Sequence, residues 1–154
     1  MFKGIFSPRI NLAGTYAKNA HIGQKRKYTG EPYITHPTAV AELLRINYKD
    51  TTEDMYMAAL LHDVVEDTDW SFEALREEGF AETIIEALKT VTKHSEDEDY
   101  DEFIQRSLKN EIGRKVKIAD LRENLDVTRI GELADKDIER INKYKRALKT
   151  LTER

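Results

Sequence analysis

Apolar side chains recur along most of this chain at the three- and four-residue spacing of amphipathic helices, and the alternating pattern of a half-buried strand is nearly absent. Turn and capping residues interrupt this pattern at intervals. We therefore expect an all-α fold, a single-domain multi-helix bundle over residues 1–154, without an internal repeat or a linker. The expected helices cover residues 10–24, 36–47, 52–67, 71–79, 83–91, 102–108, 111–125 and 136–151.

Several of these boundaries carry a chemical signature. Thr51 or Thr52 can cap the third helix, because a Thr side chain before a helix accepts a hydrogen bond from a free N–H group of its first turn. Pro37 fits the first turn of the second helix. Gly79 is expected to end the fourth helix, and Asn110 to cap the seventh.

The last expected helix carries an apolar stripe on an otherwise basic surface. A stripe of this kind packs either against the core or against a partner helix, and we expect core packing. Its members recur at helical spacing and are Ile138, Ile141, Tyr144, Leu148 and Leu151.

The most informative stretch lies in the third expected helix, where one imidazole and three carboxylates fall within an apolar segment, LLHDVVED at residues 60–67. Positions i and i+4 share a helix face. On one continuous helix, His62, Asp63, Glu66 and Asp67 would therefore occupy a sector of about 140°. A helix that is apolar nearly all round is usually buried, and buried carboxylates must be paired, hydrogen-bonded or bound to metal. We favour a metal site over a solvated acidic face.

Two further polar residues stand in apolar surroundings. His36 lies at a loop-to-helix junction, and Asp120 lies in mid-helix, where Asp is locally disfavoured. Together with His62 and Asp63 they would form a site of two imidazoles and two carboxylates. Such a ligand set suits Mn²⁺, Fe²⁺, Co²⁺ or Zn²⁺, and a bound ion of this kind polarises a phosphoryl oxygen and acidifies water. Glu66 and Asp67, one turn beyond, could orient or deprotonate that water.

Composition narrows the setting of this chemistry. With 154 residues, 40% hydrophobic and 35% charged, the chain reads as globular and long enough for a sizeable core. The net charge of -4 argues against broad binding to nucleic acid or to an anionic membrane. Cysteine is absent, which excludes thiolate metal ligands and disulfides. No run of about 18 apolar residues exists, so we expect a cytoplasmic protein.

The spacing of His36, the His62-Asp63 pair and Asp120 resembles that of the HD-domain metal-dependent phosphohydrolases. Longer blocks look like the hydrolase domain of RelA/SpoT-type alarmone enzymes, and the resemblance covers roughly residues 13–130. These blocks are AHIGQKRK at 20–27, GEPYITHP at 30–37, ALLHDVVEDT at 59–68, VTK at 91–93 and KIAD at 117–120.

This resemblance implies a specific reaction of the stringent response. The family removes the 3′-pyrophosphate from guanosine tetra- and pentaphosphate (ppGpp and pppGpp) by metal-activated water, with Mn²⁺ as the cofactor. We expect a stand-alone hydrolase that binds a small phosphorylated nucleotide. The implied roles are metal ligation for His36, His62, Asp63 and Asp120, handling of the hydrolytic water for Glu66 and Asp67, and substrate binding for Arg26, Lys27 and Asn124.

The chain departs from the family pattern at two places. Between Lys27 and Gly30 it carries Tyr28-Thr29, one residue more than the common pattern, so the loop that holds the base is expected to differ. After Asp120 it reads LRENLDV, where the long enzymes usually carry an Arg directly after the Asp and a His before the Asn. We therefore expect the substrate contacts of that helix to differ from those of the long enzymes, and we expect its metal ligand to be the same.

Other interpretations stay open on the sequence alone. The enzyme could act on another phosphate ester, a nucleoside monophosphate or the 2′-phosphate of NADPH, or the chain could be a catalytically silent nucleotide-binding module. Arg26 and Lys27 could be an exposed basic loop, and His21 could support the site or the fold. The acidic segment 94–101 is expected to be a solvated loop, and the sequence does not decide whether it covers the site or how many copies assemble.

Overall fold

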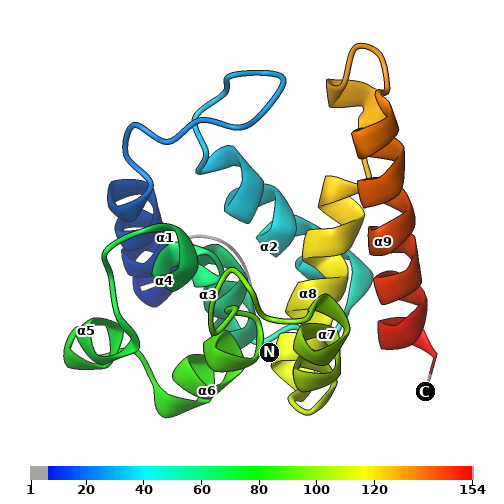
Figure 1. The fold of residues 1–154 in the computed structure, drawn as a ribbon. Coiled ribbons are helices and arrows are strands. Elements are labelled where there is room, and N and C mark those ends of the chain that lie inside the picture. The colour runs from blue at the N-terminus through cyan, green and yellow to red at the C-terminus, as the bar shows by residue number, and fades with distance from the viewer. Residues whose placement is uncertain (1–6, 154) are drawn as a thin grey trace.

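The computed structural model describes residues 7–153, and over these residues the chain is all-helical, with a single Lys25–Pro32 bridge and no strand (Figure 1). The predicted fold class is confirmed. The two ends of the predicted domain, residues 1–6 and residue 154, lie outside the described residues. The helices are α1 Pro8–Ala20, α2 Thr35–Asn47, α3 Glu53–Leu61, α4 Val64–Asp67, α5 Phe72–Glu77, α6 Glu82–Thr90, α7 Tyr100–Leu108, α8 Glu111–Asn124, the 3₁₀ turn η1 Val127–Arg129 and α9 Asp135–Thr152.

The molecule is built around α3, which packs against α1, α2, α6 and α8. All residues of α3 from Met55 to Leu61 are buried, so this helix has no solvent-facing side over that segment. Its start follows the predicted signature, since the Thr52 hydroxyl accepts a hydrogen bond from the N–H of Met55 at 3.2 Å. Because α3 is surrounded in this way, the residues that directly follow its last turn lie in the interior of the bundle.

The prediction of one helix over residues 52–67 is wrong. Helix α3 ends at Leu61, and α4 begins at Val64 after a turn at His62 and Asp63. The N–H of His62 reaches the carbonyl of Ala59 rather than the carbonyl four residues back, and Asp63 has φ -105° and ψ 0°. The turn redirects the chain, so the two residues are placed by a bend between helices and not by one continuous face.

Two other boundaries also differ from the prediction. Helix α1 ends at Ala20 instead of continuing to residue 24, because Gly23 adopts a left-handed φ of 80°. The chain then turns back so that the N–H of Tyr33 donates to the carbonyl of Gln24 at 2.8 Å. Helix α7 begins at Tyr100, two residues before the expected start, since the Asp99 side chain caps it by accepting from the N–H of Glu102.

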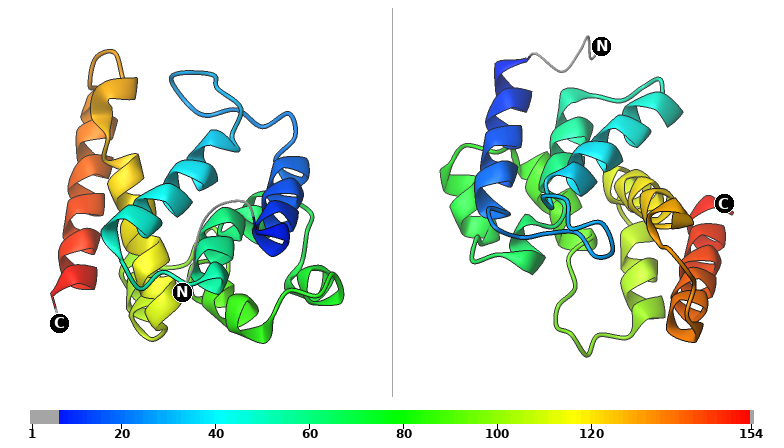
Figure 2. Two further views of the ribbon diagram at one scale, coloured as in Figure 1. Left: turned by 180° about the vertical axis from the view of Figure 1, so that it is seen from behind. Right: turned by 90° about the horizontal axis from the view of Figure 1, so that it is seen from above.

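A second core cluster joins α7, α8 and α9, with Ile104, Ile118, Leu121, Ala147 and Leu151 at its centre. Views from two directions place α9 on the side of the bundle away from α1 (Figure 2). The expected core packing of the α9 stripe holds for its C-terminal half. It is wrong for Ile138, which is 45% exposed, because only the later turns of α9 contact the cluster.

Close helix packing explains Gly113, the buried third residue of α8. A Cβ at this position would lie 2.0 Å from Oγ1 of Thr90 on α6, whereas a Cβ at Gly14 in α1 would meet nothing within 4 Å. We expect Gly113→Ala to lower the free energy of unfolding by about 1–3 kcal/mol through overpacking. Gly14→Ala should raise it by about 0.5–1 kcal/mol through helix propensity. Urea unfolding measures both, and a Gly113→Ala protein as stable as the wild type would contradict the packing described here.

Among residues 7–153, no helix is both long and apolar enough to cross a lipid bilayer. The connection between α1 and α2 and the connection between α8 and α9 extend from the same end of the bundle (Figures 1 and 2). These two segments flank the side chains described next.

Candidate metal centre and active site

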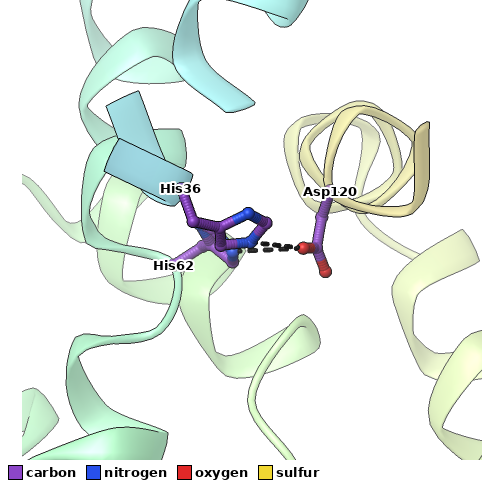
Figure 3. Close-up of side chains that lie close together, drawn as sticks. All are labelled: His36, His62 and Asp120. Carbon is purple, nitrogen blue, oxygen red and sulfur yellow. Dashed lines mark hydrogen bonds and ion pairs between the residues drawn. The ribbon is translucent and has the colours of Figure 1, made fainter. Parts of the chain in front are cut away.

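Three helical elements bring His36, His62 and Asp120 together (Figure 3). His36 comes from the first turn of α2, His62 from the turn after α3, and Asp120 from the middle of α8. Nε2 of His36 lies 2.9 Å from Oδ1 of Asp120, and Nε2 of His62 lies 3.5 Å from the same oxygen. One ligand atom from each residue lies within 4.8 Å of the others, and all three residues are buried. The cluster has the donors of a metal site.

Asp63, the fourth predicted ligand, lies against the two imidazoles of this cluster. Its Oδ2 is 3.1 Å from Nε2 of His62 and 3.8 Å from Nε2 of His36. The Tyr33 hydroxyl donates to the same Oδ2 at 2.6 Å. Tyr33 is a site residue that the sequence did not identify, although it lies within the block that carries His36.

The protein holds both imidazoles by their Nδ1 atoms, so that their Nε2 atoms face one space. Nδ1 of His62 lies 2.7 Å from the carbonyl oxygen of Ala59, and Nδ1 of His36 lies 3.3 Å from Oε1 of Glu123. A metal-binding histidine commonly donates its other ring N–H in this way. Nε2 of His62 is buried and makes no well-aligned hydrogen bond, although Oδ2 of Asp63 lies 3.1 Å away as an ion-pair partner. This unsatisfied atom and the nitrogen and oxygen donors around it fit a divalent cation.

The charges around the cluster favour ionised carboxylates. Although burial alone would raise the pKa of Asp120, Lys117 and the two histidines hold it well below its ordinary value. Lys117 donates to Oδ2 of Asp120 and Asn124 donates to Oδ1, both at 3.0 Å. Burial opposes the charged form of both histidines, but the facing carboxylates raise the pKa of each above its ordinary value. Protons therefore compete with a cation for the Nε2 atoms.

The predicted acidic pair borders the same cavity as the cluster. Oε1 of Glu66 accepts from the backbone N–H of Lys93 at 2.8 Å, and Oδ2 of Asp67 accepts from Nε2 of Gln24 at 3.2 Å. Burial, followed for Asp67 by the negative charge of Asp63, raises the pKa of both carboxyl groups. A carboxylate with a raised pKa is a better proton acceptor at neutral pH.

His21 supports this pair indirectly. Its Nδ1 lies 2.8 Å from Oε1 of Gln24, and its ring packs on Tyr33 with the ring centroids 4.9 Å apart. When the Gln24 oxygen faces His21, its amide nitrogen faces Asp67. His21 is therefore linked to the acidic pair through Gln24, and it is buried away from the cluster of His36, His62 and Asp120.

The cluster opens into a chain of adjoining cavities. The central cavity, of about 180 Å³, is lined by cations and by site residues. The cations are Lys93, Lys117 and Lys143, and the site residues include His36, Asp63, Glu66, Asp67 and Asp120. It shares Asn124 and Tyr144 with a cavity of about 320 Å³ next to the α1–α2 connection. It shares Glu66, Asp67 and Lys93 with a third cavity of about 780 Å³ beside the α6–α7 connection. Anionic groups of an extended ligand would meet cations on both flanks of the cluster.

The three predicted substrate-binding residues line the 320 Å³ cavity together. Arg26 is partly buried and ion-pairs with Glu123 at 2.5 Å, whereas Lys27 is exposed. Asn124 is tied to Asp120, as described above. Sequence reasoning gave no role to the cations that complete the cavities, although Lys93 and Lys117 lie within the blocks that carry the family resemblance. They are Arg129 and Arg140 in this cavity and Lys93, Lys117 and Lys143 in the central one.

Tyr28, in the 27–30 loop where the sequence predicts a departure from the family pattern, has a structural role. Tyr28 adopts a left-handed φ of 71°, which is uncommon for an aromatic residue. Its hydroxyl contacts the Asp137 carboxylate and accepts from Nη2 of Arg140 at 2.8 Å, both on α9. Hydrogen bonds from Tyr28 and from the N–H of Ala134 lower the pKa of Asp137 to about 2. The loop is thereby attached to α9 across the mouth of the 320 Å³ cavity.

Comparison with known proteins agrees with this arrangement. The family model described as "HD domain" matches residues 13–131. A guanosine-3′,5′-bis(diphosphate) 3′-pyrophosphohydrolase from Haemophilus influenzae is 48% identical over 77 residues, which are 50% of this chain and 11% of that protein. The bifunctional (p)ppGpp synthase/hydrolase SpoT from Escherichia coli is 42% identical over 88 residues, or 55% of this chain and 12% of that protein. The chain thus spans about a tenth of the length of these curated relatives.

A solved structure is similar over nearly the whole chain. It belongs to a metazoan ortholog of SpoT, described as a protein that hydrolyses ppGpp and plays a role in starvation responses. The two structures superpose with a TM-score of 0.78 at 26% sequence identity, over 99% of this chain and 89% of the other. The shared fold therefore includes α9, beyond the residues that the family model covers.

Proposed function

The chain belongs to the HD-domain family, and on that premise we propose that it is a metal-dependent hydrolase that removes the 3′-pyrophosphate from guanosine tetra- or pentaphosphate. The observation that carries this proposal is the buried cluster of His36, His62 and Asp120, which opens into cavities flanked by cations. A metazoan protein with the same fold is described as hydrolysing ppGpp. We further place the protein in the cytoplasm, in keeping with its lack of cysteine.

His36, His62 and Asp120 would hold the metal ion, and Asp63 would be the fourth ligand. Two imidazoles and two carboxylates without sulfur suit Mn²⁺, and other divalent transition metals suit them as well. Such an ion, when bound, polarises phosphoryl oxygens and lowers the pKa of water. Tyr33 holds Asp63 in place through its hydrogen bond to Oδ2.

Glu66 and Asp67 would receive the proton of the attacking water. Each carboxylate is fixed by one hydrogen bond from a neighbouring segment, Glu66 by the N–H of Lys93 and Asp67 by Gln24. Both residues line the central cavity, where a water molecule would be positioned between them and the metal cluster. Water adds to the α-phosphorus of the 3′-diphosphate as the bond between this phosphorus and the ribose 3′-oxygen breaks, so that pyrophosphate leaves and the 3′-oxygen takes up a proton.

Arg26, Lys27 and Asn124 would bind the nucleotide in the 320 Å³ cavity. A guanosine with diphosphates at both the 3′ and 5′ positions carries two separate anionic clusters. Lys93, Lys117 and Lys143 line the central cavity, and Arg129 and Arg140 line its neighbour. Cations in two adjoining cavities suit such a substrate better than a nucleotide with a single phosphate group.

A comparison of products tests the substrate. The purified protein, stripped with EDTA and reloaded with Mn²⁺, would be offered guanosine tetraphosphate, NADPH and nucleoside monophosphates, and pyrophosphate and orthophosphate would be measured separately. Pyrophosphate from the tetraphosphate is the expected product. Release of orthophosphate from NADPH or from a monophosphate would agree with the proposed metal site but would contradict guanosine tetraphosphate as the substrate. Binding of the tetraphosphate without turnover of any compound would identify a nucleotide-binding module.

Metal binding should also stabilise the fold. Mn²⁺ at about 100 times its dissociation constant adds ~2.7 kcal/mol to the free energy of unfolding, and we expect the Tm of the EDTA-treated protein to rise by roughly 5–10 °C. The fourth histidine, His94, is exposed and lies outside the cluster. His94→Ala should show the same rise, and His62→Ala should show little or none. An equal rise in both variants would place the ion elsewhere.

A further inference from the structure

One buried carboxylate, Glu123, joins the metal cluster to the loop that carries the predicted nucleotide-binding cations. We propose that Glu123 is a positioning residue that orients the metal ligand His36 and the substrate-binding Arg26 at the same time. This inference rests on the proposed function, because it takes His36 as a metal ligand and Arg26 as a nucleotide contact. Nothing in the periodicity of the sequence singles out Glu123, which lies in α8 between polar neighbours.

The contacts of Glu123 divide between its two oxygens. Oε1 lies 3.3 Å from Nδ1 of His36 and 2.5 Å from Nη1 of Arg26. Oε2 accepts from Nη1 of Arg129 at 3.3 Å, and Nη2 of Arg129 also donates to the backbone carbonyl of Glu123 at 3.2 Å. The residue is 9% exposed. A single buried carboxylate therefore accepts from an imidazole and from two guanidinium groups.

The contact with His36 determines which ring nitrogen faces the cluster. An anionic acceptor at Nδ1 keeps a proton on that nitrogen, so Nε2, which lies 2.9 Å from Oδ1 of Asp120, is the ring nitrogen that can exchange its proton for a cation. The partner of His62 at the corresponding position is only the neutral carbonyl of Ala59. Glu123 thus supplies the one carboxylate among the described residues that contacts Nδ1 of a histidine in the cluster.

The contact with Arg26 fixes a group that has no helix to hold it. Arg26 lies in the connection between α1 and α2, yet its side chain is only 9% exposed. Without Glu123 this guanidinium would lose the carboxylate that it pairs with and could leave the cavity wall for solvent. Glu123 itself cannot move freely, because it follows Asp120 by three residues on the rigid helix α8. Helix α8 therefore carries both the metal ligand Asp120 and the acid that orients His36 on α2 and pairs with Arg26.

Direct Mn²⁺ titration tests the first half of this proposal without any substrate. The EDTA-stripped protein would be titrated with Mn²⁺ while the electron paramagnetic resonance signal of the free ion is recorded. We expect Glu123→Ala to weaken the affinity by about 10–100-fold, as is typical for loss of a residue that orients a metal ligand. Glu123→Gln keeps an acceptor oxygen for His36, so its affinity should lie closer to that of the wild type, roughly threefold to tenfold weaker.

Glu111→Gln provides a matched control. Glu111 also lies on α8 and also pairs with an arginine, Arg114, at 2.7 Å, but it is outside the cluster and its cavities. Its Mn²⁺ affinity should equal that of the wild type. The proposal is overturned if Glu123→Ala binds Mn²⁺ within twofold of the wild type, if Glu111→Gln loses as much affinity, or if the wild type binds no Mn²⁺. If Glu123→Ala fails to fold, Glu123→Gln takes its place in the test, and a Mn²⁺ affinity within twofold of the wild type would then overturn the proposal.

A double-mutant cycle on KM tests the second half. Arg26→Ala alone should raise the KM for guanosine tetraphosphate, and the same substitution in the Glu123→Gln background should raise it by a clearly smaller factor, because Arg26 is already displaced. Equal factors in both backgrounds would show that Glu123 does not position Arg26. If the wild type binds Mn²⁺ but does not hydrolyse the tetraphosphate, the proposed function fails, and the role of Glu123 toward His36 is still decided by the titration.

Discussion

Replacing Asp120 by asparagine should lower the turnover of guanosine tetraphosphate by about 10³-fold or more. A metal ion supplies several kcal/mol of transition-state stabilisation in such reactions, and each 1.36 kcal/mol corresponds to a factor of ten in rate. Asp120 is the carboxylate that lies within 3.5 Å of Nε2 of both His36 and His62. Its amide counterpart has nearly the same shape but no charge, so the loss should reflect the missing anionic donor rather than a change of fold.

The measurement is a steady-state rate at saturating Mn²⁺, accompanied by Mn²⁺ titration and by circular dichroism. Asp50→Asn is the matched control, because Asp50 also accepts from a lysine of α8, Lys115 at 3.2 Å, but it is exposed and lies outside the cluster. We expect the control to keep full activity. An Asp120→Asn protein that retains a tenth or more of the wild-type rate would contradict the assignment of Asp120 as a metal ligand.

The second large effect is expected for Glu66→Gln, which should lower kcat by roughly 10²–10⁴-fold while leaving the Mn²⁺ affinity unchanged. Proton transfer by a positioned side chain typically contributes this factor. Glu66 lines the central cavity but is not among the residues whose ligand atoms converge on the cluster. A glutamine oxygen can still accept the hydrogen bond from the N–H of Lys93, so the surrounding structure should persist.

Two outcomes would separate this role from others. A loss of Mn²⁺ affinity equal to that of Asp120→Asn would make Glu66 a metal ligand instead of a proton acceptor. A rate within threefold of the wild type would leave the acceptor role to Asp67 alone. Glu86→Gln serves as the control, because Glu86 is an exposed residue of α6 that pairs with Lys89 outside the site.

Much of the helical framework could be predicted from periodicity and caps. Thr52 and Asn110, both predicted as caps, each accept a backbone hydrogen bond at the start of the helix that follows, and Ser71, the predicted first residue of the fourth helix, does the same. The polar residues that stood in apolar surroundings, His36, His62 and Asp120, are the ones whose ligand atoms converge. A buried polar side chain has to be satisfied, so an apolar sequence context indicates such positions, although Glu66 and Asp67 share that context without joining the cluster.

The break at His62 and Asp63 could not be predicted in the same way. The segment has a helical pattern throughout, and at the turn Asp63 accepts a tertiary hydrogen bond from the Tyr33 hydroxyl, while Nδ1 of His62 makes a local contact with the carbonyl oxygen of Ala59 three residues back. Glu123 was missed for a related reason. Its partners Arg26 and His36 lie nearly a hundred residues away, and a single glutamate on a charged helix is ordinarily solvated.

The most direct test of the whole account is the amount of pyrophosphate released per guanosine tetraphosphate consumed, measured as Mn²⁺ is titrated into the EDTA-stripped protein. We expect no release without metal, and one pyrophosphate per nucleotide once the site is filled, with half-maximal activity at the same Mn²⁺ concentration as half-maximal binding. Release that is independent of metal, or orthophosphate in place of pyrophosphate, would contradict it.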